Sequence, residues 1–137
     1  MLNQYHFYLA FENTFCFDYL TEKVFKTYAA DINIIPVVRG GASYKEMIPS
    51  GTYLNTADFE SPKSLGQYLS YLEQNITAYA EFLQRNDQYV NEGNHTRLEN
   101  GFCDICVKVH NVHAFANHYS DVGKWINDRT CESAKDD

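Results

Sequence analysis

The sequence is 137 residues long, of which 45% are hydrophobic and 15% aromatic. A chain of this size forms one well-packed core and is too small for two ordinary domains. Its 18 acidic and 11 basic residues give a net charge of −7 and a pI near 5.1, so nucleic acid, itself negative, is not expected as a partner. No segment approaches the roughly 20 apolar residues that a membrane helix requires, and we expect the chain as given to be soluble.

The first forty residues predict a strand, a helix and a second strand. Residues 5–11 (YHFYLAF) are short and aromatic-rich, which favours a buried strand. Apolar side chains across residues 19–28 have helical spacing, and Asp18 or Thr21 is placed to cap the first turn. Residues 32–38 (INIIPVV) form a continuous apolar run, as expected of a strand covered on both faces in a parallel sheet.

Further elements of the same kind follow. A short helix is expected around residues 44–48 and a third strand at residues 53–54, with a Pro-Ser-Gly turn between them. Ser61 followed by Pro62 is a helix-start signal, a capping hydroxyl before proline at the first helical position. The alternation predicts an α/β fold with right-handed crossovers. Because three strands are few for such a sheet, we expect upstream sequence to supply others.

The rest of the chain predicts helices. Apolar spacing predicts one helix near residues 76–83 and another near 102–109, and residues 86–100 between them are polar and turn-rich. We therefore expect an α/β region, residues 1–90, followed by a helical tail, residues 91–137.

Candidate binding residues lie after the first predicted strand. In open α/β sheets ligands bind where strands end and helices begin, because helix N-termini present unpaired N–H groups. Asn13 follows the strand, and Glu22 and Lys23 fall in the first turns of the next helix. Glu22 is suited to accept hydrogen bonds from ribose hydroxyls and Lys23 to pair with phosphate. On spacing alone, a solvated Glu–Lys pair on a helix surface is the simpler interpretation.

Longer motifs change that balance. Residues 7–23 (FYLAFENTFCFDYLTEK) resemble the hallmark of α1,3-fucosyltransferases, glycosyltransferase family 10, in which a FYLAFENS-type strand end is followed by DYITEK. Residues 34–72 are similar to the family's PVV-G and D-(F/Y)-x-S-P-x-x-L-x-x-Y-L stretch, and residues 102–110 (FCDICVKVH) to its C-x-x-C element. Gly123-Lys124-Trp125 lies where many members have a closing tryptophan segment. The resemblance covers nearly the whole chain.

The resemblance implies a fold and an activity. The fold is the C-terminal half of a two-Rossmann, type B glycosyltransferase: a partial Rossmann-like parallel sheet with a helical C-terminal tail. The activity is inverting transfer of L-fucose from GDP-β-L-fucose to O3 of N-acetylglucosamine in a glycan or glycoprotein. Asn13 and Tyr19 would line the donor pocket, Glu22 would bind ribose and Lys23 would face the diphosphate. The family's catalytic base lies in a separate N-terminal domain, so we expect this chain alone to bind GDP-fucose weakly and to transfer nothing.

The chain also departs from the family pattern. Thr14 replaces the commoner serine, and Arg39-Gly40-Gly41 replaces the usual leucine-glycine-proline. Arg39, at the end of a strand, either contacts donor phosphate or is an ordinary surface arginine. These departures leave the acceptor subtype open.

The cysteines allow two interpretations. Cys103 and Cys106, with His110 and His113, suggest zinc, since thiolates and imidazoles are its usual ligands. Only three residues separate Cys106 from His110, however, whereas finger-type sites use a longer spacer. The family resemblance implies instead a structural Cys103–Cys106 disulfide, with the other two cysteines unassigned.

The sequence also carries signs of a secretory compartment. Asn75 and Asn94 each begin a glycosylation sequon, which is compatible with an oxidising, glycosylating environment. The resemblance implies the Golgi lumen, as part of a single-pass type II membrane protein anchored upstream. Family members often respond to Mn²⁺, but no Asp-x-Asp motif occurs and no metal site is assigned. A non-catalytic binding module without a nucleotide pocket is the alternative, and GDP binding distinguishes the two.

Overall fold

The computed structural model describes residues 5–28, 32–89, 94–127 and 131–132. Backbone contacts divide the chain into one unit made of residues 1–91 and 129–137, and a second made of residues 92–128. Of the residues that follow 127, the structure describes Cys131 and Glu132, and these two belong to the first unit.

Strands and helices alternate through most of the first unit. Its elements are β1 (Phe7–Phe11), β2 (Phe15–Cys16), α1 (Glu22–Phe25), the 3₁₀ turn η2 (Lys26–Tyr28), β3 (Ile35–Arg39), α2 (Tyr44–Met47), β4 (Leu54–Asn55), the 3₁₀ turn η3 (Thr56–Asp58), α3 (Pro62–Gln74), α4 (Ile76–Asn86) and β5 (Cys131–Glu132). The predicted α/β class is confirmed.

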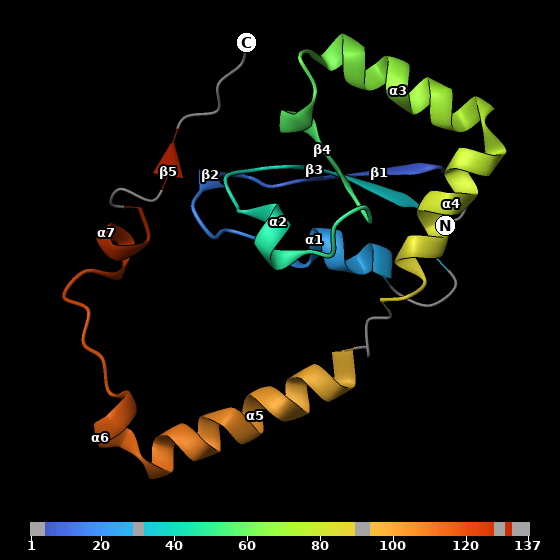
Figure 1. Ribbon diagram of the computed structural model, residues 1–137. Helices are drawn as coiled ribbons and strands as arrows, with labels where there is room; N and C mark the ends of the chain where they lie inside the picture. The colour runs from blue at the N-terminus through green and yellow to red at the C-terminus, as the bar shows by residue number, and fades with distance from the viewer. Residues whose placement is uncertain (1–4, 29–31, 90–93, 128–130, 133–137) are drawn as a thin grey trace. The chain divides into compact units, whose positions relative to one another are not determined.

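β1, β3 and β4 form a parallel sheet in the order β1-β3-β4 (Figure 1). The central strand, β3, pairs along its whole length with β1, from Ile35 opposite Phe7 to Arg39 opposite Phe11. Because parallel strands end at the same edge of a sheet, the carboxyl ends of all three lie together. Those ends position the site described below.

Helices cover both faces of the sheet. Ile35 and Val37 of β3 are fully buried in a cluster with Leu72 of α3 and Phe82 of α4. Val38, the next residue along the strand, packs on the opposite face in the cluster that α1 and α2 complete. Figure 1 shows α3 on one side of the strands and α1 and α2 on the other. Both faces are apolar, which explains the unbroken apolar run.

Helix α3 begins where the sequence predicted. The Ser61 hydroxyl accepts a hydrogen bond from the Ser64 N–H at 3.1 Å, and the Ser64 hydroxyl accepts one from the Ser61 N–H at 3.0 Å. Pro62 occupies the first helical position. This reciprocal capping box fixes the start of the helix shortly after β4.

Two predicted boundaries are wrong. The third strand lies at Leu54–Asn55, one residue later than expected. Residues 86–100, expected to be a turn-rich connection, include the end of α4 and the start of helix α5 (Asn94–His110). Polar residues occur in helices as well as in loops, so polarity there is a poor sign of a loop.

The second unit contains α5, α6 (Val112–Phe115) and α7 (Val122–Asn127). The helix expected near residues 102–109 is confirmed within α5, and side chains from residue 100 to residue 126 are exposed. In the part of the chain that the structure describes, no helix is both long enough and apolar enough to span a membrane.

Candidate functional site

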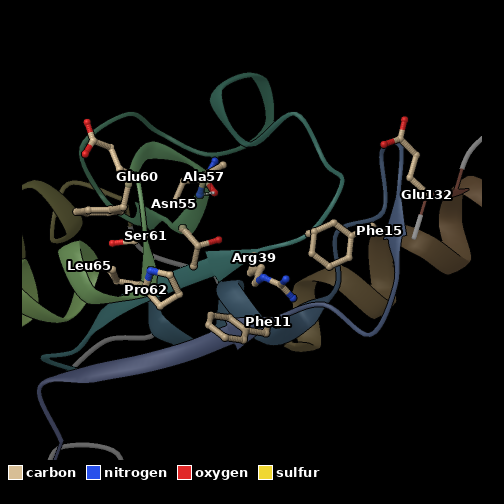
Figure 2. A pocket seen from close by; sticks show the side chains of 13 residues that line it. Phe11, Phe15, Arg39, Asn55, Ala57, Glu60, Ser61, Pro62, Leu65 and Glu132 are labelled. Atoms are coloured by element: carbon tan, nitrogen blue, oxygen red, sulfur yellow. Dashed lines mark hydrogen bonds between the residues drawn. The ribbon is translucent and has the colours of Figure 1, made fainter. Parts of the chain in front are cut away.

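A cleft of about 660 Å³ lies at the carboxyl edge of the parallel sheet. Figure 2 shows its lining residues grouped around the strand ends and the start of α3. They are Phe11, Phe15, Arg39, Gly40, Asn55, Thr56, Ala57, Phe59, Glu60, Ser61, Pro62, Leu65 and Glu132. The volume falls within the range of about 300–1,000 Å³ that small-ligand sites occupy.

The lining combines aromatic surface with groups that favour an anion. Phe11, Phe15 and Phe59 supply apolar rings. The first turn of α3, at Pro62, supplies the partial positive charge of a helix N-terminus. The same lining carries the carboxylates of Glu60 and Glu132, so the cleft presents groups of both charges to a ligand.

Arg39 adds a positive charge to the cleft. It ends β3, and its guanidinium lies 4.7 Å from the centroid of the Phe15 ring. Figure 2 shows the guanidinium between Phe11 and Phe15. A cation–π contact thus orients this side chain in the cleft wall. Its contact with phosphate stays a prediction.

Lys23 reaches from α1 to the carboxyl end of β1. Its ammonium donates hydrogen bonds to the main-chain carbonyl of Phe11 at 2.6 Å and to Oδ1 of Asn13 at 2.5 Å. It also lies 3.7 Å from Oε2 of Glu12, and the Lys23 side chain is 25% exposed. These hydrogen bonds use two of its three N–H groups. The structure thus brings the side chains of Asn13 and Lys23 together at the carboxyl end of β1.

Glu12 is buried beneath this lysine. Its Oε1 accepts a hydrogen bond from the main-chain N–H of Thr21 at 2.9 Å, and the Thr21 hydroxyl donates to Oε2 at 2.8 Å. The side chain is only 1% exposed. The sequence interpretation assigned Glu12 no role. The available signal was an acidic residue directly after an apolar strand.

Glu22 and Tyr19 occupy other positions. Glu22 begins α1, is 65% exposed and pairs with Lys26 at 3.3 Å. Its own main-chain N–H and then Lys26 lower the pKa of Glu22, which keeps the carboxylate ionised at neutral pH. Tyr19 is partly buried, and its N–H donates to the Cys16 carbonyl at 3.2 Å. None of the four predicted donor residues, Asn13, Tyr19, Glu22 and Lys23, lines the cleft itself, so their donor contacts stay predictions.

Gly40 lies between the cleft and the buried side chains of Glu12 and Tyr44. It lines the cleft, and a Cβ there would lie 2.6 Å from Oη of Tyr44 and 3.1 Å from Cβ of Glu12. Tyr44 is 3% exposed, and its hydroxyl has no hydrogen-bond partner among the described residues. Burial, followed by the charge of Glu12, raises the pKa of Tyr44 to about 12. Only a glycine allows this close packing.

Buried tyrosines predict a loss of stability at alkaline pH. Burial raises the pKa of both Tyr28 and Tyr44 to about 12, from 10.0. A pKa raised by folding contributes stability that is fully present below pH 10 and lost as the pH rises toward 12. We expect the urea midpoint to fall over this interval, and to fall less in a Tyr28→Phe/Tyr44→Phe variant. An equal fall in the two proteins would reject this origin.

The cysteine pairing differs from the one that the family resemblance implied. Cys16 of β2 and Cys131 of β5 form a disulfide, whereas Cys103 and Cys106 are free and exposed on α5. Residues three apart on a helix hold their Cβ atoms about 5–6 Å apart, and a disulfide needs about 3.5–4.5 Å. The Cys103–Cys106 bridge is therefore corrected to two free thiols.

The zinc interpretation finds no ligand group. Within the described ranges, no three Cys, His, Asp or Glu side chains gather as a metal site. Nδ1 of His110 lies 2.8 Å from the carbonyl oxygen of Cys106. His113 belongs to α6, after α5 has ended. His110 and His113, which are close in sequence, thus belong to two different helices.

Of the two predicted glycosylation sites, the structure describes the side chain of Asn75. Asn75 caps α4, accepting a hydrogen bond from the Ala78 N–H at 3.1 Å, and its Nδ2 donates to the Tyr71 hydroxyl at 3.1 Å. Glycosylation would use that same nitrogen, and it stays a prediction. The side chain of Asn94 lies outside the described residues.

The fold and the site define part of an open α/β protein whose ligand cleft lies at the carboxyl ends of parallel strands. The family model for the C-terminal part of glycosyltransferase family 10 (fucosyltransferase) matches residues 1–125. The chain belongs to this family, as its motifs indicated.

Individual relatives agree with this assignment. The chain is 38% identical over 108 residues to alpha-(1,3)-fucosyltransferase fut-1 of Caenorhabditis elegans, covering 74% of this chain and 25% of the relative. It is 34% identical over 124 residues to alpha-(1,3)-fucosyltransferase C of Drosophila melanogaster, covering 88% and 27%. A crystal structure of alpha1,3-fucosyltransferase with GDP-fucose matches with a TM-score of 0.56 and 30% identity, over 67% of this chain and 26% of that one. The chain thus spans about a quarter of the length of these relatives.

Proposed function

We propose that this chain is the donor-binding part of an α1,3-fucosyltransferase and that it binds GDP-fucose at the carboxyl edge of its sheet. The observation that carries the proposal is the position of Lys23, whose ammonium is held at the end of β1 by the carbonyl of the cleft residue Phe11. The cleft supplies aromatic surface for a guanine ring and a helix start for a diphosphate. A solved structure to which the chain is similar was determined with GDP-fucose.

Each predicted residue has a part in this proposal. Lys23 pairs with the diphosphate, and Arg39 adds a second positive charge at the cleft. Glu22 accepts hydrogen bonds from the ribose hydroxyls, a role that suits a carboxylate with a lowered pKa. Asn13 and Tyr19, which lie outside the cleft lining, contact the donor from the side of β1 and α1.

The proposed reaction inverts the configuration of the sugar. O3 of an acceptor N-acetylglucosamine attacks C1 of fucose while the bond from C1 to the β-phosphate oxygen breaks, and GDP leaves with that electron pair. Lys23 stabilises the negative charge that develops on the diphosphate. The base that takes the acceptor's proton belongs to sequence outside this chain, so the chain alone binds donor and transfers no fucose.

The proposal extends to the cellular setting. The protein would act in the Golgi lumen on glycan or glycoprotein acceptors, as part of a type II membrane protein anchored by sequence outside this chain. The proposal assigns no Mn²⁺ site to this chain. Support comes from family membership and from the disulfide, which suits an oxidising compartment.

Calorimetric titration with GDP tests the donor site. We expect the purified chain to bind GDP and Lys23→Met to weaken binding about tenfold, because a charge-assisted contact with phosphate is lost. Lys108→Met removes the same charge from an exposed residue of α5 and should leave the dissociation constant unchanged. With GDP-fucose and acceptor added, these samples should form no fucosylated product.

Two results would reject the proposal. One is a chain that is folded by circular dichroism and has no affinity for GDP, which would favour a non-catalytic binding module. The other is a Lys23→Met variant that binds GDP as tightly as the wild type does.

A further inference from the structure

We propose that Glu12 is a positioning residue of the donor site, whose buried carboxylate holds the Lys23 ammonium in the orientation that meets the diphosphate. The inference rests on the proposed function and deepens it. It assigns an effect on donor binding to a residue that is covered by protein and does not line the cleft.

The contacts of Glu12 are those of a carboxylate held in one orientation. Its side chain is 1% exposed. Thr21 donates to it twice, from the main-chain N–H at 2.9 Å and from the hydroxyl at 2.8 Å. A buried charge is strongly unfavourable unless specific partners satisfy it. Thr21 and Lys23 are those partners, and both belong to the start of α1.

The carboxylate also restricts a flexible cation. Lysine carries its charge on a four-carbon stem that loses considerable entropy when it is fixed. Three oxygen groups surround the Lys23 ammonium: the Phe11 carbonyl, Asn13 Oδ1 and, at 3.7 Å, Glu12 Oε2. Of these three, only the carboxylate is charged. When the ammonium is already held in its binding position, less free energy is lost to ordering the side chain on phosphate binding, and the affinity is higher.

The surroundings of Glu12 limit its own movement. On one side lies Gly40, so close that an added Cβ would be 3.1 Å from both Cβ and Cγ of Glu12. Tyr44, also buried, packs against the same glycine. Because Gly40 lines the cleft, the carboxylate is packed directly behind the cleft wall.

A double-mutant cycle tests this inference. Calorimetry measures GDP binding to the wild type, Glu12→Gln, Lys23→Met and the double variant. We expect Glu12→Gln to weaken binding about fivefold in the wild type and less than about twofold in the Lys23→Met background, because it acts through the lysine. A purely structural role would weaken binding by the same factor in both backgrounds.

The outcomes separate the inference from the proposed function. If Lys23→Met weakens binding but Glu12→Gln does not, or does so equally in both backgrounds, the inference is overturned and the proposed function stands. A folded wild type without GDP affinity overturns both. If Glu12→Gln fails to fold, Thr21→Val decides, because it removes the hydroxyl that holds the carboxylate and keeps the main-chain N–H. We expect Thr21→Val to weaken GDP binding about threefold when Lys23 is present and not when it is replaced. An unchanged GDP affinity in Thr21→Val would overturn the inference.

Discussion

Replacing Cys16 and Cys131 together by serine is expected to lower the free energy of unfolding by about 2–4 kcal/mol. The disulfide joins residues 115 positions apart, so it removes much of the conformational freedom of the unfolded chain. The strands that it joins, β2 and β5, are two residues long each. Such a short ladder is not stable by itself.

The same substitution is expected to weaken GDP binding. Phe15 and Glu132 line the cleft and lie opposite each other in the β2–β5 ladder, directly beside the disulfide. Without the covalent link, the two-residue β2–β5 ladder at this part of the cleft wall is less constrained. Calorimetry with GDP, below the unfolding transition, measures the effect.

Urea denaturation followed by far-ultraviolet circular dichroism measures the stability change. The matched control is Cys103→Ser/Cys106→Ser, which alters two free, exposed thiols and should change the free energy of unfolding by less than about 0.5 kcal/mol. If the control lowered the free energy of unfolding as much as the Cys16→Ser/Cys131→Ser variant does, the disulfide assignment would be contradicted.

Gly41→Ala is expected to lower the free energy of unfolding by about 1–3 kcal/mol. A Cβ at this position would lie 2.8 Å from the carbonyl oxygen of Cys16 and 2.8 Å from the carbonyl carbon of Phe15. These are main-chain atoms of β2, so the strand itself has to move to relieve the steric clash. Because Phe15 lines the cleft, GDP binding should weaken as well.

Gly66→Ala is the matched control for this prediction, again measured by urea denaturation. Gly66 lies inside α3, and a Cβ there would meet nothing within 4 Å. Alanine is the better helix former by about 0.5–1 kcal/mol, so this variant should be more stable than the wild type. A Gly41→Ala variant as stable as Gly66→Ala would show that β2 tolerates the added atom.

Helices and strands that depend on neighbouring residues could be predicted from the sequence. The run across β3 indicated a strand buried on both faces, since Val37 and Val38 pack against different helix layers. Ser61 and Pro62 marked the start of α3, because capping needs only neighbouring residues. The start of α5 was missed because its polar sequence has no apolar pattern of helical spacing to reveal it.

The candidate site was predictable in part. Motifs indicated Asn13 and Lys23, and the structure brings these two side chains together at the end of β1. Glu12 was missed because its partner Thr21 is nine positions away, and only the turn from strand to helix brings them together. The place of Arg39 in the cleft depends equally on Phe15, which belongs to a different strand.

The amino-acid sequence alone determined the family and the parallel α/β class, and it placed the candidate donor residues after the first strand, because motifs and hydrophobic periods are properties of neighbouring residues. Only the tertiary structure decided that Cys16 pairs with Cys131, that a carboxylate lies buried under Lys23, and that a cleft joins the strand ends to the start of α3. These features depend on contacts between residues far apart in the chain, and no local pattern encodes which distant partners meet.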